Sequence, residues 1–189
     1  MIKSRILLAG TVIFALLSST STDAQVLQTQ FPEMETSTAD GKVVELPIDT
    51  NGKFTLLGLA FSKKSEDDLN TWMEPVYWTF IDKPDGKVDQ LFGSQQYDVN
   101  AFFVPMFTGI KTAATKTAKK QALKKMDPRL IPSILFYRGK LKPYKESLDF
   151  KKKDIPYFFV LDENGTIVYA TSGRYSDEKM AIVEDLVSQ

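Results

Sequence analysis

The sequence of 189 residues contains no cysteine and no histidine. The thiolate is the nucleophile of disulfide exchange and of thiol-based peroxide reduction, so the chain cannot run either reaction by that route. The commonest general base and the commonest transition-metal ligand are also absent. These absences exclude Ser-His hydrolases, cysteine peptidases, zinc enzymes built on imidazole and haem proteins with a histidine ligand. These absences leave carboxylate chemistry and oxygen-ligated metals open; we nonetheless expect no enzyme activity, no cofactor and no metal site.

Long hydrophobic runs are scarce, and the one at the N-terminus has a clear interpretation. Lys3 and Arg5 precede an apolar run over Ile6–Leu17, and a polar stretch then ends at Ala24. This pattern predicts a cleavable signal peptide over residues 1–24 and a periplasmic or secreted protein. The run is shorter than the roughly 18 residues that a membrane-spanning helix needs, although an uncleaved anchor is the alternative. We expect no stable membrane span after cleavage.

The remaining chain, residues 25–189, has the length of one ordinary domain. About 165 residues can bury a core without disulfide bonds. We expect residues 25–38 to form a flexible leader because they are mostly polar. Phe31-Pro32 opens the folded part, and Asp40-Gly41-Lys42 is then typical of a turn before a short strand over 43–46.

Charge is balanced overall but unevenly distributed. The formal net charge is zero, whereas Lys111–Lys153 contains fourteen basic and three acidic residues, a net charge of +11. This segment either holds an acidic protein surface, phosphate groups or an anionic membrane, or is simply a solvated face. Aromatic residues are not interleaved with its lysines as base stacking requires, so we expect no nucleic-acid binding.

The most regular pattern in the chain predicts a buried strand followed by a helix. Residues 54–61 are continuously apolar, as in a strand that is buried on both faces. The helix is indicated by apolar residues at three- and four-residue spacing, with Ser65 and Asp68 as its predicted capping box and Pro75 as a bend. Its apolar face comprises Leu69, Trp72, Met73, Val76, Tyr77 and Phe80.

The second half of the chain predicts a helix-rich insertion and then a hairpin. Asn164-Gly165 is typical of the tight turn between two strands, and Ser176 is a suitable cap for a final helix. The predicted elements are a loop over 81–96, a strand over 97–106, a cationic helix over 109–126, an extra edge strand over 134–137, a basic connection over 140–153 with a short helix, strands over 157–161 and 166–170, and the terminal helix.

The order of these elements, together with Ile155-Pro156 ahead of the hairpin, resembles the thioredoxin-like (redoxin) superfamily. The resemblance implies an α/β fold of three layers, α/β/α, with a central mixed sheet and a basic helical insertion before Pro156. In that family the proline is cis and its neighbours pair with the backbone of a substrate. The resemblance thus implies a peptide-binding groove at Ile155, Pro156 and Tyr157; burial of the Tyr157 strand under the terminal helix is the alternative.

The chain departs from the family where the Cys-x-x-Cys pair belongs. Counting from the preceding strand places Lys64–Asp67 there, whereas counting from Pro75 places Asp67–Asn70 there, and neither segment contains sulfur. A weaker resemblance is to the mitochondrial ATP synthase assembly factor family, which has a thioredoxin-like fold. It rests on Trp72–Pro75, Phe103–Pro105 and Phe159–Asp162, and it implies a non-redox role in assembly.

The start of the predicted helix offers a second candidate site. Lys63, Lys64 and Ser65 stand where free backbone N–H groups bind anions, although a capped helix with solvated lysines is the alternative. The acidic residues Glu66, Asp67 and Asp68 point in different directions on a helix, so we expect no metal site.

These observations favour a non-catalytic thioredoxin-like binding module that helps an extracytoplasmic protein partner to fold or assemble. Its predicted binding residues are Ile155, Pro156, Tyr157, Lys63, Lys64 and Ser65. One alternative is a thiol-independent enzyme, such as a glutathione-transferase-like protein that uses Ser62 or Ser65. Another is a module that binds an anionic surface through Lys111–Lys153.

Overall fold

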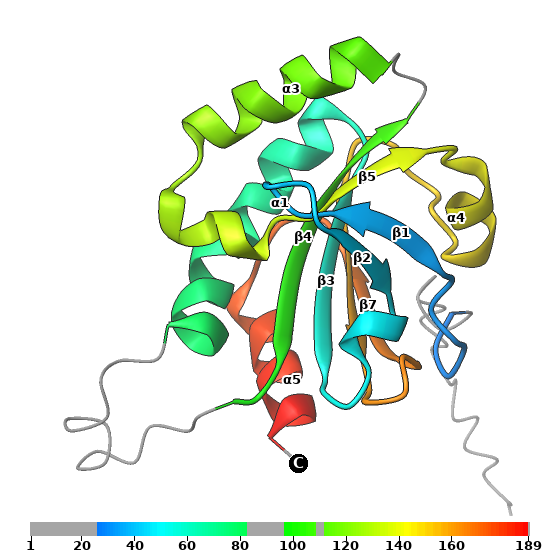
Figure 1. The fold of residues 1–189 in the computed structure, drawn as a ribbon. Coiled ribbons are helices and arrows are strands. Elements are labelled where there is room, and N and C mark those ends of the chain that lie inside the picture. The colour runs from blue at the N-terminus through cyan, green and yellow to red at the C-terminus, as the bar shows by residue number, and fades with distance from the viewer. Residues whose placement is uncertain (1–25, 83–96, 109–111, 189) are drawn as a thin grey trace, which may run out of the picture.

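One mixed sheet forms the centre of the molecule (Figure 1). A computed structural model describes residues 26–82, 97–108 and 112–188. Within those residues seven strands lie in the order β2-β1-β5-β4-β3-β6-β7. Their bounds are β1 Met34–Ser37, β2 Val43–Leu46, β3 Thr55–Ala60, β4 Asn100–Thr108, β5 Phe136–Gly139, β6 Tyr157–Leu161 and β7 Ile167–Ser172. β4 runs parallel to β3 and to β5, and the other pairs are antiparallel.

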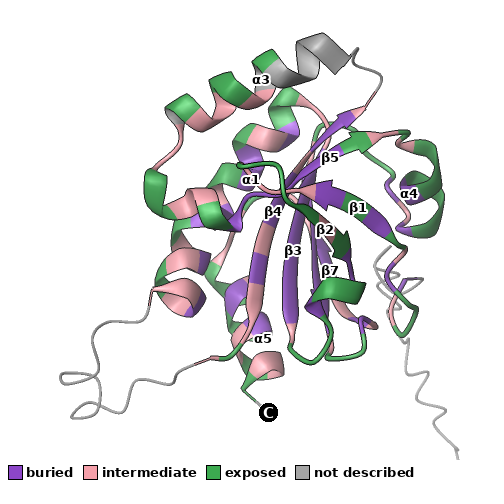
Figure 2. Ribbon diagram, in the orientation of Figure 1, coloured by how far each residue is buried: buried purple, intermediate pink, exposed green. Residues whose placement is uncertain are grey.

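Helices cover both faces of this sheet and give the predicted three layers. α1 (Lys63–Val76) and α5 (Asp177–Val187) enclose one apolar cluster on one face, whereas α4 (Lys142–Ser147) and the segment around Val26 and Phe31 enclose the other. All six residues of β3 are buried, as the continuous apolar pattern predicted (Figure 2). The expected α/β architecture, with a basic helical insertion between β4 and β6, is confirmed.

The N-cap of α1 lies three residues before the predicted cap, Ser65. Ser62, with an extended backbone, is the N-cap, and Ser65 at the third helical position completes a capping box with it. The prediction that Ser65 and Asp68 form this box was therefore wrong by one turn. Pro75 has no N–H to donate to the preceding turn, and the helix passes directly into a π-helical turn, η3 (Tyr77–Ile81).

The insertion between β4 and β6 contains the predicted cationic helix. α3 (Thr112–Lys125) is followed by the 3-10 helix η4 (Pro128–Ser133), and Leu123 and Leu130 pack against the α1 side of the core. β5 forms close to where a strand was predicted, but it isn't an edge strand. It lies between β4 and β1 because the β1–β2 hairpin extends the sheet beyond it.

The predicted flexible leader is contradicted over most of its length. Val26 and Phe31 are buried, and Met34–Ser37 forms β1. The backbone N–H of Gln28 also donates to Ile167, which attaches the segment to β7. A few buried apolar side chains between polar residues are thus enough to anchor the segment. The predicted signal peptide and most of the predicted loop over 81–96 lie outside the described residues.

No helix in the described ranges has the length and apolar character needed to cross a membrane.

Candidate functional site

The N-terminus of α1 is closed by two serines separated by two residues. The backbone N–H of Ser65 donates to the Ser62 hydroxyl at 3.1 Å, and the Ser65 hydroxyl accepts from the backbone N–H of Ser62 at 2.9 Å. The helix begins at Lys63, ahead of the two segments that were counted from the strand and from Pro75, Lys64–Asp67 and Asp67–Asn70. The Ser-x-x-Ser spacing at 62–65 therefore occupies the first turn.

The fold brings the two predicted sites, the start of α1 and the loop with Ile155 and Pro156, close together. The Ser62 hydroxyl donates to the Asp154 carboxylate at 3.0 Å, which joins the start of α1 to the loop that carries Ile155 and Pro156. Ser65 is completely buried and donates its own hydroxyl proton to the Ser62 carbonyl at 2.9 Å. Of the two serines, only Ser62 is partly accessible.

Both predicted lysines have carboxylate partners one turn further along α1. Lys63 pairs with Asp67 at 2.5 Å, and Lys64 pairs with Asp68 at 2.6 Å. The hydrogen bond that the Lys63 ammonium donates to Asp67 raises the pKa of Lys63. Anion binding by Lys63, Lys64 and Ser65 remains a prediction, and an anion would have to compete with these internal pairs.

The predicted peptide-binding residues are mostly covered. Pro156 and Tyr157 are buried and Ile155 is partly exposed. The Tyr157 hydroxyl bonds to the backbone N–H and carbonyl of Lys152 at 2.8 and 3.2 Å. The resemblance implied a cis bond before Pro156, but the Ile155–Pro156 bond is trans; the cis peptide bond in the described part of the chain precedes Pro47.

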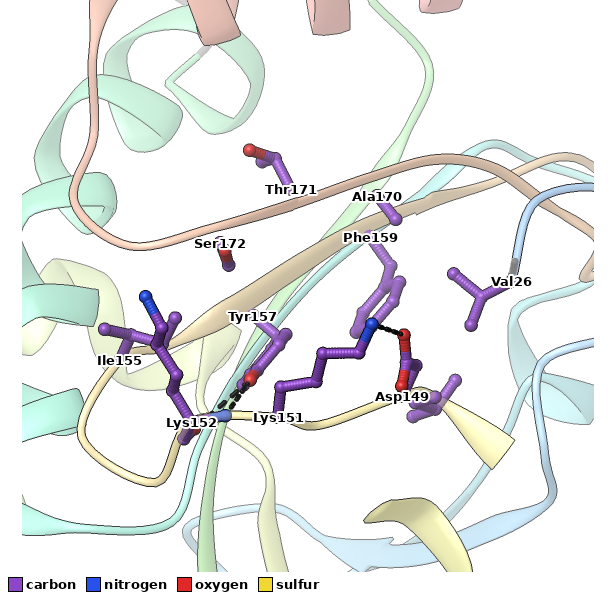
Figure 3. A pocket seen from close by; sticks show the side chains of 11 residues that line it. Val26, Asp149, Lys151, Lys152, Ile155, Tyr157, Phe159, Ala170, Thr171 and Ser172 are labelled. Atoms are coloured by element: carbon purple, nitrogen blue, oxygen red, sulfur yellow. Dashed lines mark hydrogen bonds and ion pairs between the residues drawn. The ribbon is translucent and has the colours of Figure 1, made fainter. Parts of the chain in front are cut away.

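A small pocket of about 140 Å³ lies beside Ile155 and Tyr157. Figure 3 shows the Lys151 ammonium next to the Asp149 carboxylate, 3.0 Å apart, with the Tyr157 hydroxyl against the Lys152 backbone. The Tyr157 ring, which lines this pocket, lies against the rings of Phe61 and Phe150. Tyr157 is thus part of an aromatic cluster and is buried.

A much larger groove, of about 760 Å³, includes Ser62 in its lining. It runs between α1, the end of β4, α3 and η4, and we call it the α1–α3 groove. Its lining is largely apolar and includes Met73, Met106 and Met126, whose flexible thioethers adapt to different partners. Its volume lies within the range of roughly 300–1,000 Å³ that is typical of ligand sites.

Aromatic and cationic side chains gather at one end of this groove. Tyr77 and Arg129 line it, and the Arg129 guanidinium lies 5.3 Å from the Tyr77 ring centre and 5.2 Å from that of Trp78. Trp78 belongs to the π-helical turn and is 53% exposed. Trp, Tyr and Arg are the residues most enriched among the energetically dominant contacts of protein interfaces.

Two carboxylates near the start of α1 have opposite environments. Glu66 lines the groove, and burial raises the pKa of its carboxyl. Asp68 faces away from the groove, where hydrogen bonds from Lys64 and then Arg174 hold the pKa of its carboxyl below the ordinary value. Asp68 is thus satisfied within the protein.

Sequence reasoning missed the polar stripe of the groove wall, formed by Glu66, Asn70 and Glu74. Their spacing of four residues places them on one helix face, a signal that the sequence does contain. The sequence doesn't reveal that α3 lies opposite this stripe. Over the described ranges, no three His, Cys, Asp or Glu side chains are grouped so as to hold a metal ion.

Comparison with known proteins finds similarity in structure only. No protein-family model and no curated protein sequence matches the chain. Among solved structures, the reduced 2-Cys peroxiredoxin of Plasmodium vivax has a TM-score of 0.52 with 15% identity, covering 85% of this chain and 96% of that one. BsSco, a member of the Sco family of cytochrome c oxidase assembly proteins, has a TM-score of 0.52 with 11% identity, covering 86% and 94%. The chain therefore has a thioredoxin-like fold, without the cysteines that thiol chemistry requires.

Proposed function

We propose that the chain is a non-catalytic binding module that holds a polypeptide segment of a partner protein in the α1–α3 groove. The observation that carries this proposal is the groove itself, about 760 Å³ in volume and lined by three methionines, with Trp78, Tyr77 and Arg129 at one end. An open apolar groove between two helices suits an apolar polypeptide segment.

The side chains at the start of α1 support a role without catalysis. Ser65 is buried and its hydroxyl is engaged at Ser62, so it is poorly placed to attack or to orient a substrate. Ser62 has no histidine to activate it, and serine is a weak nucleophile without a base. Both hydroxyls instead stabilise the first turn of the helix.

The cellular setting is part of the same proposal. The basic start, the apolar run and the polar close of residues 1–24 support export, so the partner is an extracytoplasmic protein. A protein that binds a partner without a chemical reaction is suited to assist the folding or assembly of that partner.

The test is a peptide selection with a variant that fills the groove. Random peptides displayed on phage are selected against the protein without residues 1–24, and the affinities of the strongest are measured by fluorescence polarisation. Ala122 lines the groove, so Ala122→Trp fills it. Ala181→Trp is the matched control, because Ala181 is exposed on α5 outside the groove.

We expect Ala122→Trp to weaken peptide binding at least tenfold, which is about 1.4 kcal/mol. Ala181→Trp should change the affinity less than twofold, and both variants should unfold at nearly the same temperature as the wild type. Failure to select any peptide, or equal affinities in the two variants, would contradict the proposal.

A further inference from the structure

The cations in the lining of the α1–α3 groove are already neutralised within the protein. Lys63 pairs with Asp67 at 2.5 Å. Arg129 pairs with Asp127 at 2.6 Å and lies over two aromatic rings. Neither cation is therefore available to a ligand without breaking an internal contact.

The carboxylates of the groove wall are in the opposite situation. Glu66 is half-buried in the lining; its carboxylate forms no hydrogen bond and no direct ion pair with a described residue, although the nearby charge of Lys63 favours its ionised form. Glu74 also lines the groove without a direct partner in the described part of the chain, and its charge acts on the Arg129 guanidinium. Removing a carboxylate from water without a partner is unfavourable, and burial accordingly raises the pKa of Glu66.

The two carboxylates are spaced along the groove rather than clustered. Eight residues separate Glu66 from Glu74, which is about 12 Å along a helix. The Asn70 side chain lies between them in the same lining. An extended peptide covers about the same distance in four residues. One bound segment is therefore long enough to reach both carboxylates.

Among the described residues, the basic segment contributes Arg129 to the groove but no lysine of α3. α3 contributes Gln121, Ala122 and the following Met126 to the lining, whereas its exposed lysines Lys120 and Lys124 lie outside it. Among the described side chains, the groove therefore has an apolar floor, one wall that carries Glu66 and Glu74, and an opposite wall to which α3 contributes no lysine.

From this arrangement, which rests on the proposed function, we infer that the groove binds an apolar segment of a partner protein flanked by lysine or arginine side chains. The apolar side chains occupy the floor beside the three methionines. A basic side chain pairs with Glu66, and a second reaches Glu74 or Asn70. Charged residues at the edge of an interface affect which partner binds more than how tightly it binds. The preference for basic side chains therefore concerns specificity.

The test uses three synthetic peptides with identical leucine and phenylalanine positions. They carry lysine, glutamine or glutamate at two flanking positions four residues apart. Dissociation constants are measured by fluorescence polarisation for the wild type, for Glu66→Gln/Glu74→Gln and for Ala122→Trp. Glu163→Gln is the matched control, because Glu163 is exposed in the β6–β7 hairpin outside the groove.

The wild type should bind the lysine peptide at least tenfold more tightly than the glutamate peptide, and this ratio should fall with added salt. In Glu66→Gln/Glu74→Gln the ratio should drop below threefold, while the glutamine peptide binds as before. Glu163→Gln should retain the wild-type ratio.

Two failures are distinguishable. If all three peptides bind equally and Ala122→Trp still blocks them, the basic preference is wrong but the groove remains a peptide site. If no peptide binds, or Ala122→Trp leaves binding unchanged, the proposed function fails and this inference fails with it.

Discussion

The small pocket beside Tyr157 and the α1–α3 groove differ in volume, lining and charge. The pocket beside Ile155 and Tyr157 measures about 140 Å³ and includes the ion pair of Lys151 with Asp149. The α1–α3 groove measures about 760 Å³ and presents Glu66 without an ion-pair partner among the described residues. The buried Oδ2 of Asp149 has the Lys151 ion pair but no hydrogen bond among the described residues, whereas Glu66 lies beside open apolar surface, which favours the groove as the proposed binding site.

The difference arises from the side chains near each cavity. The Tyr157 ring of the pocket belongs to an aromatic cluster with Phe61 and Phe150, with ring centroids 4.5–6.2 Å apart. The lining of the α1–α3 groove includes the small Ala122 and three flexible methionines, and it retains more open space. This difference is why the proposed binding site is the groove.

The largest expected effect is on the packing of α1 against the sheet. Trp72 is completely buried, stacks on Phe158 at 4.3 Å and donates its indole N–H to the Gly173 carbonyl at 3.0 Å. Trp72→Ala should lower the free energy of unfolding by about 3–5 kcal/mol, measured by urea denaturation.

Trp78→Ala is the control for this experiment. Trp78 is 53% exposed, so its loss should cost less than about 1 kcal/mol while weakening peptide binding at the groove. Equal destabilisation by the two variants would show that α1 isn't anchored through Trp72.

The next effect tests the two carboxylates of α1 against each other. The folded pKa of Asp68 is lower than its ordinary value of 3.8, so its contribution to stability is present above that pH and is lost as the pH falls through the folded pKa. Asp68→Asn should lower the melting temperature at pH 7 and flatten its dependence on pH below 4, without affecting peptide binding.

Asp67→Asn serves as the control, since that ion pair with Lys63 is exposed and should contribute little. Glu66→Gln should behave in the opposite way to Asp68→Asn. The folded pKa of Glu66 is raised, so its ionised form opposes folding at neutral pH, and its removal should leave the melting temperature equal or higher. A drop in melting temperature for Glu66→Gln would assign Glu66 a structural role.

A smaller effect concerns Ser62 at the N-terminus of α1. Ser62 caps α1 and bonds to Asp154, so Ser62→Ala should lower the free energy of unfolding by about 1 kcal/mol, measured by urea denaturation. Peptide affinity should stay within threefold of the wild type, and Ser188→Ala should change neither quantity. Turnover of a glutathione conjugate by the wild type that disappears in Ser62→Ala would contradict a non-catalytic role.

The sequence predicted the architecture better than the site, for a physical reason. Local patterns define β3 through its continuous apolar run and α1 through apolar residues such as Leu69 and Val76, because these patterns depend on near neighbours. The groove depends on α3 packing across from Glu66 and Glu74, a contact between segments about fifty residues apart. Likewise, the burial of Tyr157 depends on Phe61 and Phe150, which no local pattern brings together.

The smallest effect is expected from the most conspicuous feature of the sequence, the lysines of the basic insertion. Lys120 and Lys124 are exposed on α3 and don't line the groove. Lys120→Ala/Lys124→Ala should therefore change peptide affinity less than twofold and stability by less than about 0.5 kcal/mol.

Flotation with anionic vesicles is the second measurement, and Lys142→Ala on α4 is the control. Salt-sensitive vesicle binding that Lys120→Ala/Lys124→Ala abolishes would identify α3 as a second binding surface, and the groove would then not be the molecule's main contact with its partner.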